Sequence, residues 1–131
     1  MLTSAEIVRV IRMYEAHSRA EQGALFRITR VVEVASGVVV TRDSDGEHSV
    51  FFDQSRYFIP EGNALDDMSS KMNSLRGSGV GFFFDVTSKD VEMMTWVANE
   101  FLRQKDSKSH PRWHEPPKEL EFTRDGHLTL N

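Results

Sequence analysis

Five side chains in this sequence could act as a general acid or base if they lined a cleft. They are His17, His48, Asp53, Asp85 and Glu100. Such catalysis requires a second polar group beside the acid or base, and none of the five is singled out in this way. Asp85 is the best placed, at the end of an apolar run and just before an expected helix, but that position also suits an aspartate that caps the following turn. We favour the capping role, predict no catalytic residue and lean against an enzyme.

Three short motifs are similar to ligand sites, and each fails on order or spacing. Segment Arg76–Gly81 is rich in glycine, but phosphate-binding glycine loops follow a strand and open a helix, whereas this one follows an expected helix and opens a strand. It is better explained as a connector whose glycines need positive φ. Segment Asp43–Glu47 begins like a calcium loop, but its glycine comes too early and the closing glutamate is missing. His110 and His114 are four residues apart, yet Pro111 opposes the helix that would bring both to one metal.

The sequence therefore predicts no metal and no cofactor. With no cysteine among its 131 residues, the chain has no thiolate ligand or nucleophile and no disulfide, which suits a reducing compartment. The N-terminal residues do not have the pattern of a signal peptide. The longest apolar run, residues 80–84, is far too short to cross a bilayer. We expect a soluble cytoplasmic protein without a membrane segment.

The charge of the chain is concentrated in one block. Its net charge is −4, and residues 43–67 carry seven acidic side chains against the single base Arg56. An acidic patch attracts basic partners, and Tyr, Trp and Arg are frequent anchors of interfaces. The candidate partner-binding residues are Asp43, Asp45, Glu47, Asp53, Arg56, Tyr57, Glu61, Asp66, Asp67 and Trp113. The alternative is that these charges are solvated and that the aromatic rings cover the core.

These features favour a non-catalytic protein-binding module, most simply an acidic inhibitor or immunity-type protein that covers a basic surface of its partner. Direct nucleic-acid binding is not expected, because the basic residues near the C-terminal end are few and partly offset by acids. One alternative is a small enzyme or ligand-binding domain. Its pocket would lie between the sheet and a third helix, expected from about residue 87 to 105, with Asp85, His48 or Arg76 at the mouth of the pocket. Another is a homo-oligomeric structural or adaptor subunit, for example a homodimer, that assembles through an edge strand, either Val38–Thr41 or Leu128–Leu130.

The elements that must position these residues follow from hydrophobic periodicity and breakers. Thr3 and Glu6 form a capping-box pattern before a helix over residues 4–22, and Gly23 is placed to end that helix. Strands are predicted at 25–35, 38–41 and 49–52 as an antiparallel meander, then at 80–86, 120–123 and 128–130, with helices from about 63 to 75 and from about 87 to 105. We predict a single α+β domain over 1–131, with a mainly antiparallel sheet of about five to six strands and helices mainly on one face. Residues 103–118 are a candidate hinge before the C-terminal hairpin.

Overall fold

One helix and an antiparallel sheet make up the part of the chain that the computed structural model describes, namely residues 2–57, 77–85, 118–122 and 128–130. For residues 22, 83–85, 121–122 and 128–130 the structure describes the backbone but not the side chains. The elements are α1 (Ser4–Gln22), β1 (Ile28–Ala35), β2 (Val38–Asp43), β3 (His48–Asp53), β4 (Val80–Asp85), β5 (Lys118–Phe122) and β6 (Leu128–Leu130). The predicted α+β class is confirmed. The two further helices expected at 63–75 and 87–105, and the candidate hinge at 103–118, lie outside the described residues apart from Lys118 itself.

The N-terminal helix begins and ends where the sequence predicts. The Thr3 side chain accepts a hydrogen bond from the backbone N–H of Glu6 at 3.2 Å, which satisfies one of the donors left open in the first turn. At the other end, Gly23 has φ of 121°, a conformation that L side chains rarely adopt, and its N–H donates to the carbonyl of Arg19. The apolar residues between these caps recur at three and four positions, so one face of α1 can pack on the sheet.

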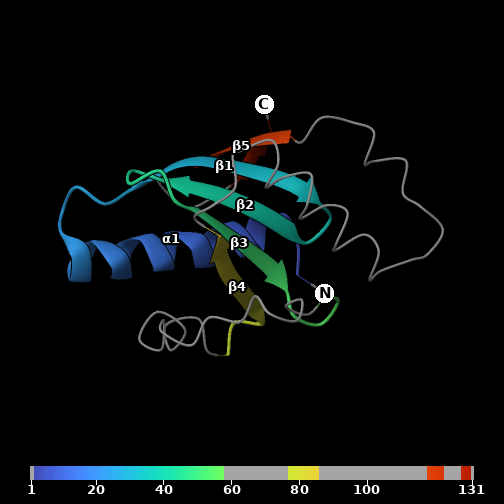
Figure 1. Cartoon of the computed structure of the whole chain (residues 1–131). Coiled ribbons are helices and arrows are strands. Elements are labelled where there is room, and N and C mark those ends of the chain that lie inside the picture. The colour runs from blue at the N-terminus through green and yellow to red at the C-terminus, as the bar shows by residue number, and fades with distance from the viewer. Residues whose placement is uncertain (1, 58–76, 86–117, 123–127, 131) are drawn as a thin grey trace.

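The six strands lie in the order β4-β3-β2-β1-β5-β6, and every pair of neighbours is antiparallel (Figure 1). The meander β1-β2-β3 is confirmed, although β1 starts at Ile28 rather than at Leu25. The expectation that Val38–Thr41 could be a sheet edge is wrong, because β2 is paired on both sides. Among the described strands the edges are β4 and β6.

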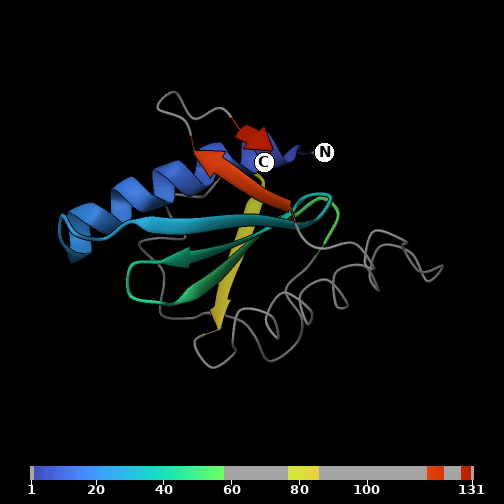
Figure 2. The same ribbon diagram turned by 90° about the horizontal axis from the view of Figure 1, so that it is seen from above.

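The core lies between α1 and one face of the sheet (Figure 2). Tyr14 stands at its centre, edge-on to Phe51 with ring centroids 5.3 Å apart, and Phe51 stacks on Phe82 at 5.2 Å. Burial raises the pKa of Tyr14 above its usual value, and a hydrogen bond with Ser49 opposes that rise only in part. The helix and two of the strands, β3 and β4, are thus joined through one aromatic cluster.

The opposite face of the sheet, called here the second face, is also apolar and buried. Val38 and Val50 are 0% exposed, and Phe52 is 1% exposed, although none of them belongs to the cluster under α1. All six residues of β3 are buried. A strand that is buried on both sides loses the usual alternation of apolar and polar residues.

Candidate functional site

The β2–β3 hairpin is held in one conformation by a buried aspartate. Asp43, at the end of β2, accepts hydrogen bonds on Oδ1 from the backbone N–H groups of Asp45 at 2.9 Å and Glu47 at 3.1 Å. Its own backbone N–H donates to the Glu47 carbonyl, and its carbonyl accepts from Gly46, which has φ of 83°. An aspartate that binds the N–H two residues ahead favours a turn, and glycine takes the positive φ without steric cost. The turn that the predicted meander requires between the strands at 38–41 and 49–52 is therefore confirmed.

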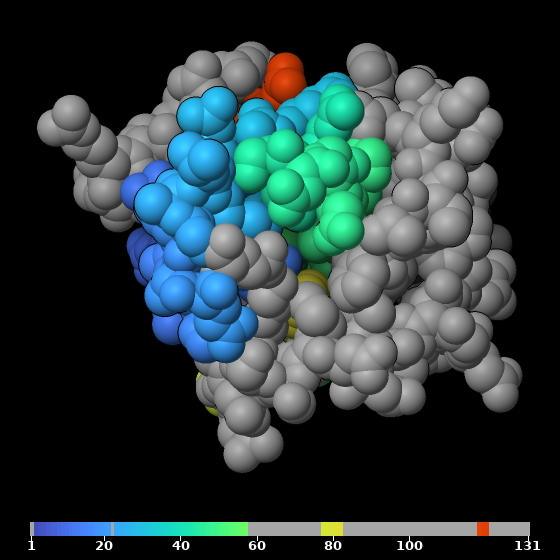
Figure 3. Space-filling model, turned by 60° about the vertical axis from the view of Figure 1, so that its left-hand side comes forward, coloured from blue at the N-terminus to red at the C-terminus, as the bar shows by residue number. Residues whose placement is uncertain are grey.

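The connection between α1 and β1 is tied to this hairpin by Ser44. The Ser44 backbone N–H donates to the Arg27 carbonyl at 2.9 Å, and the Ser44 hydroxyl accepts from the Arg27 N–H and donates to the Leu25 carbonyl. Two residues after Arg27, the Thr29 hydroxyl donates to the Arg42 carbonyl. These bonds join two loops that are distant in sequence into one end of the molecule, where the blue connection lies beside the green hairpin in Figure 3.

We call the solvent-facing part of this end the tip surface and define it as Leu25, Arg27, Ser44, Asp45 and Glu47. All five residues are exposed, and Leu25 is 91% exposed. A single exposed leucine is common on protein surfaces. This one differs because its backbone carbonyl accepts a hydrogen bond from Ser44 in the neighbouring hairpin, so the backbone that carries it need not be ordered on binding.

The predicted partner-binding residues are divided by the structure between the surface and the interior. Asp45 and Glu47 are exposed, whereas Asp43 and Asp53 are 6% and 1% exposed. The predicted residues that lie outside the described ranges are Glu61, Asp66, Asp67 and Trp113.

Arg56 and Tyr57 lie at the opposite end of the sheet, against the β1–β2 turn. The Tyr57 hydroxyl donates to the Ser36 carbonyl at 2.8 Å, and Arg56 Nη1 donates to the Ser36 hydroxyl at 3.1 Å. Tyr57 is 3% exposed, and the Arg56 guanidinium is 5.4 Å from the centre of its ring. Both side chains therefore stabilise the β1–β2 turn. For Tyr57 this agrees with the alternative given above, in which the aromatic rings of the acidic block cover the core.

Asp53 combines burial with an unusually strong hydrogen-bonding environment. Its Oδ1 accepts from the hydroxyl and the backbone N–H of Ser55 at 2.7 and 2.9 Å, and its Oδ2 accepts from the Leu2 N–H at 2.9 Å. Burial alone would raise the pKa of this carboxyl, but the bonds from Ser55 and Leu2 outweigh it and hold the pKa below 3.8. Asp53 thus ties the start of the chain to the end of β3.

The structure places two of the acid–base candidates, His48 and Asp85, opposite each other on neighbouring strands. His48 is buried at the start of β3, and the register places it opposite Arg42 on β2 and Asp85 on β4. His17 is separate, on α1, with Nε2 3.4 Å from Glu21 Oε1. Glu100 and Arg76 lie outside the described residues, as does the expected third helix that would line the pocket. In the glycine connector Gly77 and Gly79 have φ of 82° and 81°, as predicted.

Sequence reasoning missed Leu25 and Arg27 as surface residues, because it placed both in the first strand. No local signal separates a strand that starts at Leu25 from one that starts at Ile28, since both segments alternate in the same way. The difference comes from Ser44, whose bonds hold residues 25–27 as a loop.

The described residues include no group of three or more His, Asp or Glu side chains that could hold a metal ion. No helix among them combines the length and the apolar character needed to cross a bilayer.

No family model matches this chain, and neither does any curated protein or any solved structure.

Proposed function

We propose that this chain is a non-catalytic protein-binding module whose tip surface binds a partner with basic groups beside an apolar pocket. The observation that carries the proposal is the fixed backbone under Leu25, Asp45 and Glu47, which results from the bonds of Asp43 and Ser44. Residues on a fixed backbone lose less conformational freedom on binding than residues on a mobile loop, so more of their contact energy remains as affinity.

Charge supports the same partner class. The chain carries a net charge of −4, and Asp45 and Glu47 outnumber the one base of the tip surface, Arg27. Exposed carboxylates accelerate the encounter with a basic surface and select against acidic ones. An inhibitor or immunity-type role, in which the module covers a basic surface of an enzyme, uses this chemistry directly.

The test is a pull-down from a lysate of the expressing cells at low and high salt, followed by measurement of the affinity of the purified partner. Two variants alter the tip surface: Leu25→Ser removes the apolar anchor, and Asp45→Asn with Glu47→Gln removes two negative charges. The matched control, Ala16→Lys with Gln54→Lys, changes the net charge by the same amount at exposed positions away from the hairpin.

We expect each tip variant to weaken binding by about tenfold or more, as loss of an interface anchor does. The control should bind as the wild type does, and high salt should weaken the wild-type complex. If both tip variants retain the wild-type affinity for the same partner, the tip surface is not the interface and the proposal fails.

A further inference from the structure

The Asp45–Gly46 step of the β2–β3 hairpin has a composition that allows its backbone to rearrange without an enzyme. The side-chain carboxyl carbon of an aspartate can form a five-membered ring with the backbone nitrogen of the next residue. A glycine at that next position favours the reaction, because it has no Cβ to shield its nitrogen or to restrict its backbone. The chain has two such steps, Asp45–Gly46 and Asp125–Gly126. The first lies within the described residues.

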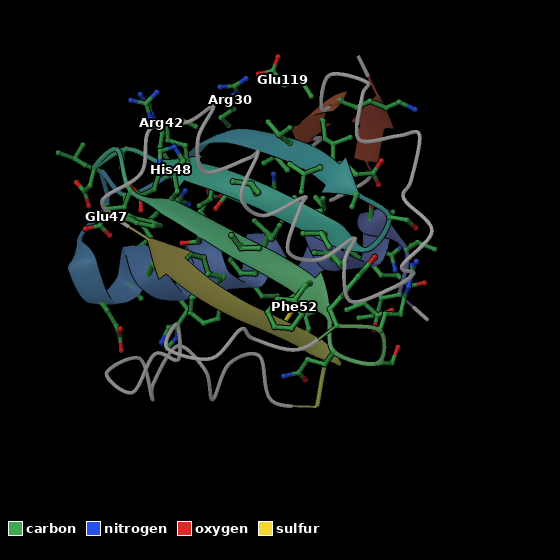
Figure 4. All side chains as sticks on the ribbon, turned by 45° about the vertical axis from the view of Figure 1, so that its right-hand side comes forward. Arg30, Arg42, Glu47, His48, Phe52 and Glu119 are labelled. Carbon is green, nitrogen blue, oxygen red and sulfur yellow. The ribbon has the colours of Figure 1, made fainter. Side chains whose placement is uncertain are left out.

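This step is open to solvent. Asp45 and Gly46 are both exposed. Within the part of the chain that the structure describes, a Cβ placed on Gly46 would meet no heavy atom within 4 Å apart from its chain neighbours. Figure 4 shows the next residue, Glu47, at the outer end of the hairpin and at the other end of the sheet from Phe52. Neither crowding nor burial therefore protects the Asp45–Gly46 step.

Hydrogen bonds to Asp43 restrain the same step. The Gly46 N–H donates to the Asp43 carbonyl at 2.9 Å. The N–H groups on either side of it, from Asp45 and Glu47, donate to Asp43 Oδ1 at 2.9 and 3.1 Å. Ring closure requires the Gly46 nitrogen to lose its proton and to turn towards the Asp45 side chain, so its bond to Asp43 must first break. The turn therefore has to open locally before the ring can form.

We propose that Asp45–Gly46 is a site of aspartate isomerisation and that Asp43 keeps this site closed in the folded protein. In the reaction the Gly46 nitrogen forms a bond to the side-chain carboxyl carbon of Asp45, and the amide hydrogen leaves with a carboxyl oxygen and its hydrogen as one water molecule. Water then opens the resulting succinimide. Cleavage of the new bond restores aspartate, whereas cleavage of the original peptide bond leaves isoaspartate, with the main chain running through Cβ. One water is released and one is consumed, so no other reactant is needed.

The rearrangement would change the turn that carries the tip surface. An isoaspartate adds one carbon atom to the main chain between Asp43 and Glu47, whose backbones are joined by a bond of 2.9 Å from the Asp43 N–H to the Glu47 carbonyl. Turn geometry depends on loop length, so the added atom disrupts this pairing. The free carboxylate at position 45 also moves from the side chain to Cα. Asp43 thus preserves the turn and its charge, whatever the tip surface binds.

The test is incubation of the full chain near neutral pH, with isoaspartate measured at each Asp–Gly step by peptide mapping and by enzymatic methylation of the isoaspartyl carboxylate. One sample is native, and the other is kept in guanidinium chloride above the unfolding transition. The Asp125–Gly126 step of the denatured sample is the reference for an unrestrained Asp–Gly step. We expect Asp45–Gly46 to isomerise at least about tenfold more slowly in the native sample than in the denatured one, because opening of the turn breaks hydrogen bonds.

Two variants distinguish the local restraint from global stability. Asp43→Ala removes the oxygen that binds two N–H groups of the turn, and it should raise the native rate at position 45 by about tenfold or more. Asp53→Ala is the matched control, because it removes a buried carboxylate that binds a turn at the other end of β3. This control should leave the native rate at position 45 near that of the wild type. Hydrogen exchange of the Gly46 N–H should be faster in the Asp43→Ala variant alone.

The proposal is overturned if the native and denatured wild type form isoaspartate at position 45 at equal rates. This comparison needs no variant, so it holds even where Asp43→Ala does not fold. Equal acceleration by Asp43→Ala and Asp53→Ala would also overturn the proposal, since the effect would then come from loss of global stability. NMR spectra show whether each variant is folded. None of these measurements involves a binding partner, so failure of the pull-down and failure of this proposal are distinguishable.

Discussion

Asp53 is the residue whose chemistry bears most directly on stability. It receives three hydrogen bonds, from the Ser55 side chain, the Ser55 backbone and the Leu2 backbone, and it is 1% exposed. All three donors favour the ionised carboxylate. Its folded pKa therefore lies below 3.8, the ordinary value that we take for the unfolded chain.

This depressed pKa predicts the sign of a pH dependence. The contribution of Asp53 to the free energy of unfolding is fully present above the unfolded pKa and is lost as the pH falls through the folded pKa. We expect Asp53→Asn to lower the free energy of unfolding by about 1–3 kcal/mol near neutral pH. The difference from the wild type should shrink on acidification.

Urea unfolding at a series of pH values from about 7 to about 3 measures this difference. Asp45→Asn, at an exposed position in the hairpin, is the control and should change the free energy of unfolding little at any of these pH values. If the difference between the wild type and the Asp53→Asn variant stays constant on acidification, the carboxylate charge is not the source of the stabilisation.

The same residue shows what the sequence could not reveal. Asp53 and Asp43 were interpreted as part of a charged surface block, because acidic residues are seldom fully buried. Each lies at the end of a strand that is mostly buried, β2 with the exception of Arg42 and β3 throughout. There the carboxylate accepts hydrogen bonds from N–H groups of the next turn. Asp45 and Glu47, which lie inside the turn itself, remain exposed as predicted.

At the scale of elements, β3 and β4 are fitted to each other at one glycine. Gly81 is the cross-strand partner of Phe52, and a Cβ added at Gly81 would lie 2.6 Å from Phe52 Cζ. The ring therefore occupies the space that any other residue at position 81 would need. Packing of an aromatic ring over a glycine on the neighbouring strand is a known way to compensate a strand glycine.

We predict that Gly81→Ala destabilises the protein by about 1–3 kcal/mol through overpacking against Phe52. Phe52→Leu shortens the side chain on the opposing strand and should relieve most of that clash. A double-mutant cycle of the free energies of unfolding should then show coupling of about 0.5–3 kcal/mol. Additive effects of the two substitutions would mean that the strain at Gly81 has another source.

The elements themselves were largely predictable, because their signals are local. Thr3, Glu6 and Gly23 mark the ends of α1, and the Asp–Gly step marks the β2–β3 turn. The two register shifts in β1 could not be predicted, since they depend on the pairing with β2 rather than on the residues of β1 alone.

For the whole molecule, the strand order was the feature that local patterns left open. β5 follows β1 in space although Ala35 and Lys118 are far apart in sequence, and this pairing places β1 in the interior of the sheet instead of at an edge. Pairings over such separations are decided by the packing of the complete chain, because each local segment is compatible with several neighbours.

This order also predicts where the structure opens first. β2 and β3 are each paired on both sides, and their side chains are buried except that of Arg42. By contrast, β5 joins β1 through two registered pairs, and β6 is paired with β5 alone among the described strands. Native-state hydrogen exchange should therefore give the β2 and β3 amides the free energy of global unfolding. The β5 and β6 amides should exchange through local opening at a lower free energy, with little dependence on denaturant. Equal free energies of exchange in all strands would instead mean that the C-terminal hairpin and the meander unfold as one cooperative unit.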